Sequence, residues 1–142
     1  MDQQTFGPHI TVDAGSCDFE KLVDYQFIYD LLTNLPEKIG MTRMTLPYVV
    51  RWKDKWATTP GISGFVMLAE SHISVHTFPE QNYAFIDIFS CREFDTQDAV
   101  EKLVSAFGAK DVHVNIVKRG LNFDRSKRWI PKRVAKKARV RV

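Results

Sequence analysis

Cysteine and long apolar runs are scarce in this chain. Among its 142 residues, Cys17 and Cys91 are the only cysteines, too few to staple a domain of this length as small secreted proteins are stapled. No run reaches the roughly 18 apolar residues that a membrane-spanning helix needs. The opening residues, MDQQT, supply neither the basic nor the apolar part of a signal peptide. The two cysteines could pair, but without an export signal we expect free thiols and a cytoplasmic protein.

Several motifs of common enzymes are missing as well. The sequence has no glycine-rich nucleotide-binding motif, no HExxH zinc motif and no CxxC pair. What it has is an ordinary globular composition, with 44% hydrophobic residues. At roughly 150 residues per domain, the length predicts one folded domain.

Positive charge is concentrated at the C-terminal end. Residues 118–142 hold eleven Lys or Arg and one acid, whereas residues 1–117 hold nine bases and sixteen acids. We therefore divide the chain into a domain, residues 1–120, and a basic tail, residues 121–142. Such a tail can bind nucleic acid, lie on the acidic body or a partner subunit, or stay solvated. Because it carries no named nucleic-acid-binding motif, nucleic acid is not the expected partner.

Apolar periodicity predicts two helices and six strands. One helix is expected over residues 19–35, with Asp18 as its N-cap and Pro36 ending or tightening its last turn. The other helix is expected to be capped by Asp95 or Thr96. The expected strands cover residues 9–12, 45–51, 65–69, 73–77, 83–90 and 111–118.

The order of these elements predicts the fold class. Short connections between the central strands favour antiparallel pairing, and two helices can cover only one face of the resulting sheet. We expect an α+β protein, a two-layer α/β sandwich with a mainly antiparallel sheet and both helices on one face. The uncovered face carries further aromatic side chains and needs a cover, which dimerisation through that face or through an edge would supply.

Residues 61–80 carry an unusual set of reactive side chains. Two strands meet at residues 70–72 with no Gly, Pro or Asn to form the turn. Strand alternation places His72, Ser74 and His76 on one face. Each has an ordinary role available, because a serine at a strand junction is usually a local hydrogen-bonding group and a histidine in a strand is usually structural.

A metal site is not expected in this segment. The nearest candidate set is His72, His76 and Cys91. Two residues four apart on a strand lie too far from each other to share one ion. We therefore predict no metal.

Taken together, the reactive residues resemble those of a known family. The run ESHISVHTFPE at residues 70–80, followed by Tyr83-Ala84, Asp87 and Cys91, closely resembles the prokaryotic S-adenosylmethionine decarboxylase proenzymes. Those proteins carry an ESHxSxHTWPE block and then a YxAxxD strand that ends in FxC. Further likeness at Pro8-His9, at the GISG run and at Val112-His113-Val114 extends the resemblance over about residues 7–120.

The resemblance implies an enzyme precursor that makes its own cofactor. The bond between Glu70 and Ser71 would break by attack of the serine hydroxyl, leaving a pyruvoyl group in place of Ser71. This group would form a Schiff base with the substrate amine and withdraw electrons as carbon dioxide leaves. The implied reaction decarboxylates S-adenosylmethionine and yields the aminopropyl donor for spermidine and other polyamines.

The resemblance also assigns roles to other residues. Ser63 would hydrogen-bond near the reacting carbonyl, and His76 would move the proton during elimination. Cys91 would return a proton to the α-carbon of the substrate. Glu80 would bind the ribose hydroxyls or another polar part of the substrate. Phe78 would also contact the substrate. The family further implies a homodimer of processed chain pairs.

The sequence departs from the family pattern where substrate binds. Phe78 replaces the usual Trp, and Arg92-Glu93 follow Cys91 where glycine is common. An aromatic stack contributes about 0.5–1.5 kcal/mol beyond its buried area, so moving one can change nucleoside binding. A pyruvoyl-dependent arginine or ornithine decarboxylase is therefore the alternative, with an acidic residue binding the cationic side chain. A non-catalytic or nucleic-acid-binding protein that uses residues 118–142 is the third interpretation.

Overall fold

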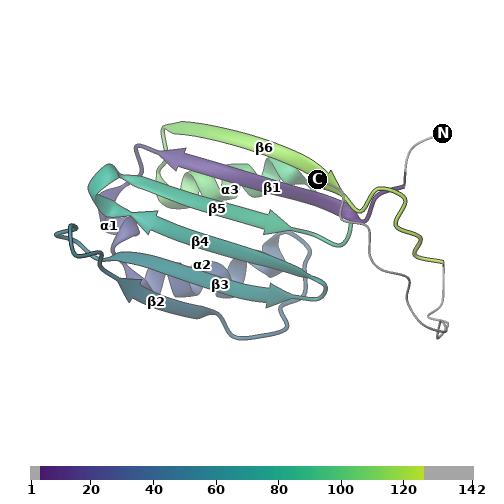
Figure 1. The fold of residues 1–142 in the computed structure, drawn as a ribbon, viewed down its shortest axis with the longest axis horizontal. Coiled ribbons are helices and arrows are strands. Elements are labelled where there is room, and N and C mark those ends of the chain that lie inside the picture. The colour runs from purple at the N-terminus through teal and green to yellow at the C-terminus, as the bar shows by residue number, and fades with distance from the viewer. Residues whose placement is uncertain (1–3, 127–142) are drawn as a thin grey trace, which may run out of the picture.

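The computed structural model describes residues 4–126, which form a six-stranded sheet with helices packed on one face (Figure 1). The strands are β1 (Gly7–Gly15), β2 (Tyr48–Trp52), β3 (Gly61–Leu68), β4 (Ser71–Phe78), β5 (Tyr83–Phe89) and β6 (Asp111–Arg119). The helices are α1 (Phe19–Leu22), α2 (Tyr25–Lys38) and α3 (Thr96–Phe107), and η1 (Pro79–Gln81) is a single 3-10 turn.

The sheet order is β2-β3-β4-β5-β1-β6, and all neighbouring strands are antiparallel. In Figure 1, α2 and α3 lie together behind the sheet, and the β3–β4 hairpin turn lies at the same end of the sheet as the start of β1 and the end of β6. The expected two-layer α+β sandwich is confirmed. β1 is longer than the apolar pattern of residues 9–12 indicates, because it pairs along its length with both β5 and β6.

The first predicted helix is two helices, so this expectation was wrong. The chain breaks after Leu22, and Asp24 caps the second helix, its side chain accepting a hydrogen bond from the Phe27 N–H at 3.0 Å. Asp18 precedes α1 but makes no side-chain capping bond among the described residues. Pro36 lies inside α2, which continues to Lys38. The apolar stripe crosses the break unchanged, and for this reason periodicity did not reveal it.

The core lies between the helices and one face of the sheet. α2 contributes Ile28, Leu32 and Leu35, and α3 contributes Ala99, Leu103 and Phe107. They pack on a layer of strand residues that are almost fully buried: Ile10, Val12, Ile62, Val66, Leu68, Ile73, Val75, Ala84, Ile86 and Ile88. This layer fixes which side chains point away from the helices, because residues alternate along each strand.

The other face of the sheet, here called the open face, is uncovered. It presents six large apolar side chains that are 42% to 76% exposed: Tyr48, Trp52, Phe65, Met67, Phe78 and Phe85. Among residues 4–126, no helix is long and apolar enough to cross a membrane. A contiguous apolar surface of this kind usually marks a binding site or an interface between proteins.

Thr77 ties the sheet to the first helix. Its hydroxyl donates to the carbonyl oxygen of Leu22 and accepts from the N–H of Ile62, both at 2.8 Å, and the residue is 4% exposed. Each bond satisfies a backbone group that is otherwise buried away from water. The side chain therefore holds the α1 end of the molecule against β3 and β4.

Replacing Thr77 with Val should lower the free energy of unfolding by about 1–3 kcal/mol, because both backbone groups lose a buried partner. Urea denaturation measures the change. The matched control is Thr11→Val on the open face of β1, which should cost less than about 0.5 kcal/mol. Equal losses in the two variants would contradict this role of Thr77.

Candidate active site

The turn between β3 and β4 consists of Ala69 and Glu70. Leu68 pairs with Ser71 across the hairpin, so the connection has the shortest common length for a hairpin. Glu70 has a φ of 53°, a left-handed conformation that costs a residue with a β-carbon about 1–2 kcal/mol. The strained residue therefore comes directly before Ser71, at the bond that the sequence predicts to break.

Cys91 packs against this turn from the end of β5. Its N–H donates to Ser71 Oγ at 3.0 Å, and its Sγ lies 3.4 Å from the carbonyl oxygen of Ala69. The residue is 8% exposed. The structure thus brings three of the predicted site residues, Glu70, Ser71 and Cys91, to one end of the sheet.

The chain beyond β6 returns to the same end. Arg125 donates hydrogen bonds to the carbonyl oxygens of Cys91 and Phe6, and its guanidinium lies 4.7 Å from the centre of the Phe6 ring. The described part of the predicted basic tail, residues 121–126, therefore lies against the domain. The nucleic-acid interpretation falls mainly on residues 127–142, which are outside the described residues.

Ser63 and His76 form a second group of predicted site residues, farther along the hairpin. They are directly opposite in the β3–β4 register, and Ser63 Oγ lies 2.7 Å from His76 Nδ1. His76 follows Ser71 by five residues, about 17 Å along an extended strand, and alternation points the two side chains to opposite faces. A single chain therefore does not bring this pair to the Glu70–Ser71 bond.

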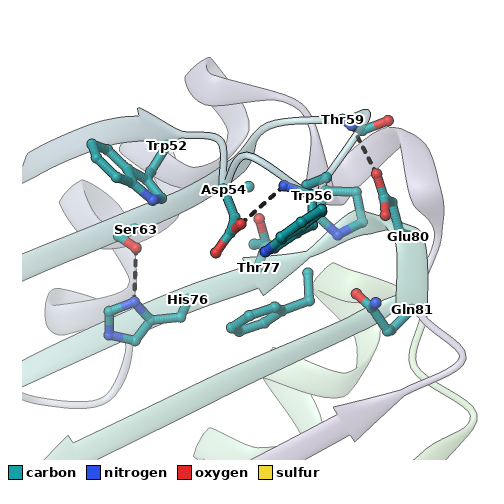
Figure 2. Close-up of a pocket in the computed structure, with 13 residues that line it drawn as sticks. Trp52, Asp54, Trp56, Thr59, Ser63, His76, Thr77, Glu80 and Gln81 are labelled. Carbon is teal, nitrogen blue, oxygen red and sulfur yellow. Dashed lines mark hydrogen bonds between the residues drawn. The ribbon is translucent and has the colours of Figure 1, made fainter.

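A cavity of about 410 Å³ opens beside this pair (Figure 2). It lies at the opposite end of the hairpin from Ser71. Its lining includes Trp52, Trp56, Ser63, His76, Phe78 and Glu80. The two indoles are 74% and 81% exposed, so both can contact a bound molecule. A role for Trp52 was not predicted; the available signal was a bulky aromatic residue at the end of a strand with an outward-facing side chain.

Glu80 is fixed at this cavity by the loop that precedes β3. Its Oε1 accepts hydrogen bonds from the Thr58 hydroxyl at 2.6 Å, the Thr58 N–H at 2.5 Å and the Thr59 N–H at 2.9 Å. The Thr58 hydroxyl first, and then the two N–H groups, hold the pKa of this carboxyl below its ordinary value of 4.5. Glu80 is therefore ionised at neutral pH, and Oε2 can accept a hydrogen bond from a ligand hydroxyl.

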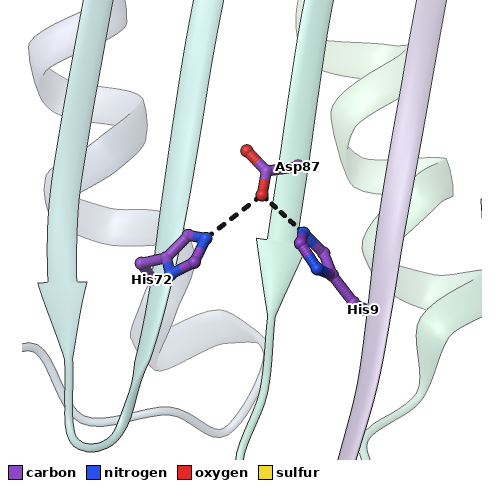
Figure 3. A group of neighbouring side chains, drawn as sticks. All are labelled: His9, His72 and Asp87. Carbon is purple, nitrogen blue, oxygen red and sulfur yellow. Dashed lines mark hydrogen bonds and ion pairs between the residues drawn. The ribbon is translucent and has the colours of Figure 1, made fainter. Parts of the chain in front are cut away.

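A third polar group lies on the open face between these two ends (Figure 3). His9 Nε2 and His72 Nε2 lie 2.6 Å and 3.2 Å from Asp87 Oδ2, and Ser74 donates to Asp87 Oδ1. Burial opposes ionisation of Asp87, but the hydrogen bonds from Ser74 and His9 and the nearby His72 outweigh it. The pKa of the Asp87 carboxyl is consequently held below its ordinary value of 3.8.

The side chains of His9, His72 and Asp87 have the composition of a metal site. Their ligand atoms lie within 4.8 Å of one another, and two histidines with one carboxylate are a common set for transition metals. However, Arg119 Nη1 lies 3.4 Å from His9 Nδ1. Because a guanidinium can only donate, the tautomer that fits this contact has Nδ1 as the acceptor and the Nε2 proton facing Asp87. The geometry is thus that of a hydrogen-bonded chain, and the expected lack of a metal stays a prediction.

The two cysteines have different environments. Both thiols are free, as the sequence predicts. Burial first, and then the negative charge of Asp18, raise the pKa of the Cys17 thiol to about 11. Cys17 therefore stays protonated and serves packing, whereas Cys91 lies at the predicted cleavage site.

A left-handed glutamate followed by a serine beside a buried thiol, and a Ser–His pair on the same antiparallel sheet, are the groups that a self-processing enzyme precursor would use. Residues 8–120 match the family model described as S-adenosylmethionine decarboxylase. The chain belongs to this family, and the resemblance noted in the sequence is confirmed.

Similar proteins from archaea and bacteria share this description. The S-adenosylmethionine decarboxylase proenzyme of Pyrococcus furiosus is 37% identical over 118 residues, which cover 82% of this chain and 81% of the relative. The S-adenosylmethionine decarboxylase proenzyme 2 of Bacillus anthracis is 34% identical over 122 residues, covering 85% and 94%. The crystal structure of the adenosylmethionine decarboxylase from Aquifex aeolicus superposes with a TM-score of 0.72 at 25% identity, covering 88% of this chain and 99% of that one.

Proposed function

We propose that this chain cleaves itself between Glu70 and Ser71 and then decarboxylates S-adenosylmethionine with the pyruvoyl group so formed. Cleavage gives chains of 70 and 72 residues. The observation that carries the proposal is the junction: the strained Glu70 precedes a serine whose hydroxyl is held by the Cys91 N–H. The names of the relatives from Pyrococcus and Bacillus supply the substrate.

Each step of the cleavage can be assigned to groups of this chain. Ser71 Oγ attacks the carbonyl carbon of Glu70, the C–N bond breaks, and the released nitrogen takes a proton, which leaves an ester. A base then removes the α-proton of residue 71, the Cβ–Oγ bond breaks, and Glu70 leaves as a carboxylate. The remaining dehydroalanine takes up water and releases ammonia. Relief of the left-handed conformation at Glu70 favours the first step.

His76 is the proposed base of the elimination step. An imidazole titrates near neutral pH and can therefore take and return a proton under physiological conditions. Ser63 holds Nδ1 of this ring at 2.7 Å, which orients the ring and leaves Nε2 for the proton. Ser63 is thus proposed both to position His76 and to hydrogen-bond at the reacting carbonyl.

Cys91 is the proposed acid in the decarboxylation. The pyruvoyl group supplies the electron sink when present. The Cys91 Sγ lies 3.4 Å from the Ala69 oxygen, so the thiol is at the turn where the cofactor forms. A thiol is a weak acid and can give its proton to the α-carbon of the substrate after carbon dioxide has left.

The cavity beside His76 is the proposed substrate site. The Trp52 and Trp56 indoles, with Phe78, offer aromatic faces on which an adenine can stack and to which a sulfonium cation is attracted. The ionised Glu80 can accept hydrogen bonds from ribose hydroxyls. Ornithine has no planar group to stack, and the guanidinium of arginine covers less of an aromatic face than adenine does, so these exposed indoles favour a nucleoside substrate over the alternative substrates.

We also propose that the enzyme is a homodimer that packs the open face of one protomer on that of its partner. The exposed aromatic and aliphatic side chains of that face would then be buried. A two-fold axis that lies in the interface and runs across the strands would place the hairpin end of one protomer on the cavity end of the other. The partner's Ser63 and His76 would thereby reach a junction that they do not reach within their own chain.

Wild-type protein should show two fragments of 70 and 72 residues by intact-mass spectrometry, and Ser71→Ala should show one intact chain, because no hydroxyl can attack Glu70. Ser74→Ala removes a hydroxyl three residues along β4 and should still cleave. A wild-type chain that stays unbroken after prolonged incubation would overturn the proposal.

Processed enzyme should release carbon dioxide from S-adenosylmethionine and not from arginine or ornithine at equal concentration. Trp56→Ala should raise KM for S-adenosylmethionine by about 2- to 10-fold with little change in kcat, since one stacking contact is lost. Phe19→Ala, which removes an exposed aromatic of α1 outside both the cavity lining and the open face, is the control. Release from arginine or ornithine instead would establish the alternative substrate class.

Co-expression tests the shared site. Neither Ser71→Ala nor His76→Ala should cleave efficiently alone, because the first lacks the nucleophile and the second the base. In mixed dimers, the His76→Ala chain keeps its own Ser71 and receives the partner's His76, so this chain should be cleaved. Mixed dimers that form without any cleavage would show that each chain processes itself.

A further inference from the structure

His72 is the residue directly after Ser71, and its side chain is anchored from three directions. Its Nε2 bonds to Asp87 of β5, and Asp87 is in turn held by His9 of β1 at 2.6 Å. Its ring stacks on Phe65 of β3 at 5.5 Å and lies 5.6 Å from Phe89. The anchoring groups thus come from three different strands, and Figure 3 shows the two rings converging on one carboxylate oxygen.

None of these contacts is used by the cleavage steps assigned above. The Asp87 carboxylate accepts from Ser74 on one oxygen and faces both histidines with the other. The side chains of His9 and Asp87 are 22% exposed, and that of His72 is 30% exposed. A half-buried carboxylate with this many donors is a well-satisfied and therefore rigid group.

Cleavage changes what holds the start of β4. Before the cut, Ser71 is held by the covalent turn and by the hydrogen bond from the Cys91 N–H to its Oγ. The cut removes the first, and the loss of Oγ with Glu70 removes the second. Ser71 pairs only with Leu68 of β3, whereas His72 pairs with both β3 and β5. His72 is consequently the first residue of the new chain with two neighbouring strands and an anchored side chain.

We propose that Asp87 and His9 are positioning residues which, through His72, hold the chain end created by cleavage in the place where decarboxylation requires it. The inference rests on the proposed function. The inference separates two stages. The network is dispensable for cleavage, because the intact hairpin positions the bond that breaks. It is required for turnover, because a displacement of the reacting group by about 1 Å can lower the rate about 100-fold.

Three variants test the inference on full-length protein. Asp87→Asn keeps the shape of the side chain but has one acceptor oxygen instead of two, so its NH2 group must face either Ser74 or the two histidines. His72→Phe keeps an aromatic ring between Phe65 and Phe89 and removes only the bond to Asp87. Asp30→Asn makes the same chemical change as the first on an exposed position of α2, away from the open face and outside the network.

Cleavage and turnover are measured separately, by intact mass and by carbon dioxide release. Asp87→Asn and His72→Phe should be cleaved to the wild-type extent, while kcat falls about 10- to 100-fold with KM changed by less than about threefold. Their double variant should lose little more than either single variant, because both remove one tether. Asp30→Asn should match wild type in both measurements.

Hydrogen exchange distinguishes lost anchoring of β4 from a general loss of stability, because a general loss would raise exchange in both processed and uncleaved protein. The amides at the start of β4 should exchange faster in processed Asp87→Asn than in processed wild type. In the uncleaved Ser71→Ala background, adding Asp87→Asn should leave those amides unchanged, because the turn still holds them.

Variants that cleave and turn over like wild type would overturn the inference, and so would equal losses of cleavage and turnover. Stoichiometric zinc on wild-type protein that Asp87→Asn loses would also overturn it, because an ion would then be the tether. A wild-type chain that never cleaves refutes the proposed function instead, so the two failures are distinguishable.

Discussion

The proposed chemistry depends on the left-handed backbone of Glu70, which a hairpin with only two connecting residues imposes. Asparagine or glycine would adopt this conformation at little cost, but glutamate does not. The energy stored there is small beside the barrier to breaking an amide. The strain matters because of its position, since the left-handed residue, the Ser71 hydroxyl and the Cys91 N–H all lie at the Glu70–Ser71 peptide bond.

Three groups of proposed functional side chains lie at different positions along the strands of the sheet. The turn and Cys91 lie at one end, the aromatic cavity with Glu80 and His76 at the other, and the His9–Asp87–His72 chain between them. Regular strand geometry holds these groups at fixed spacings that side-chain motion cannot close. A second copy is therefore the simplest way to unite the two ends, and the same face carries the apolar area that a dimer would bury.

Much of this arrangement was predictable from the sequence, and the exceptions have physical causes. Strand and helix types followed from periodicity, and the reactive hairpin from its residues. Once the turn at residues 69–70 is known, the register itself places Ser63 opposite His76. The link from His9 to Asp87 was not predictable, because 78 residues separate them and their contact depends on β1 pairing with β5. Likewise, the place of Trp52 in the cavity was not predictable, because it depends on the loop between β2 and β3 that folds beside it.

The strand order has a consequence for the two chains that cleavage would produce. The N-terminal chain supplies β1, β2 and β3, and the C-terminal chain supplies β4, β5 and β6. β1 lies between β5 and β6, and β3 pairs with β4. The strands of the two products thus alternate within one sheet. Separating the products would break three hydrogen-bonded ladders, β1–β5, β1–β6 and β3–β4. The cut would remove a covalent bond without creating two independent bodies, so we expect the cleaved protein to unfold cooperatively as a single domain.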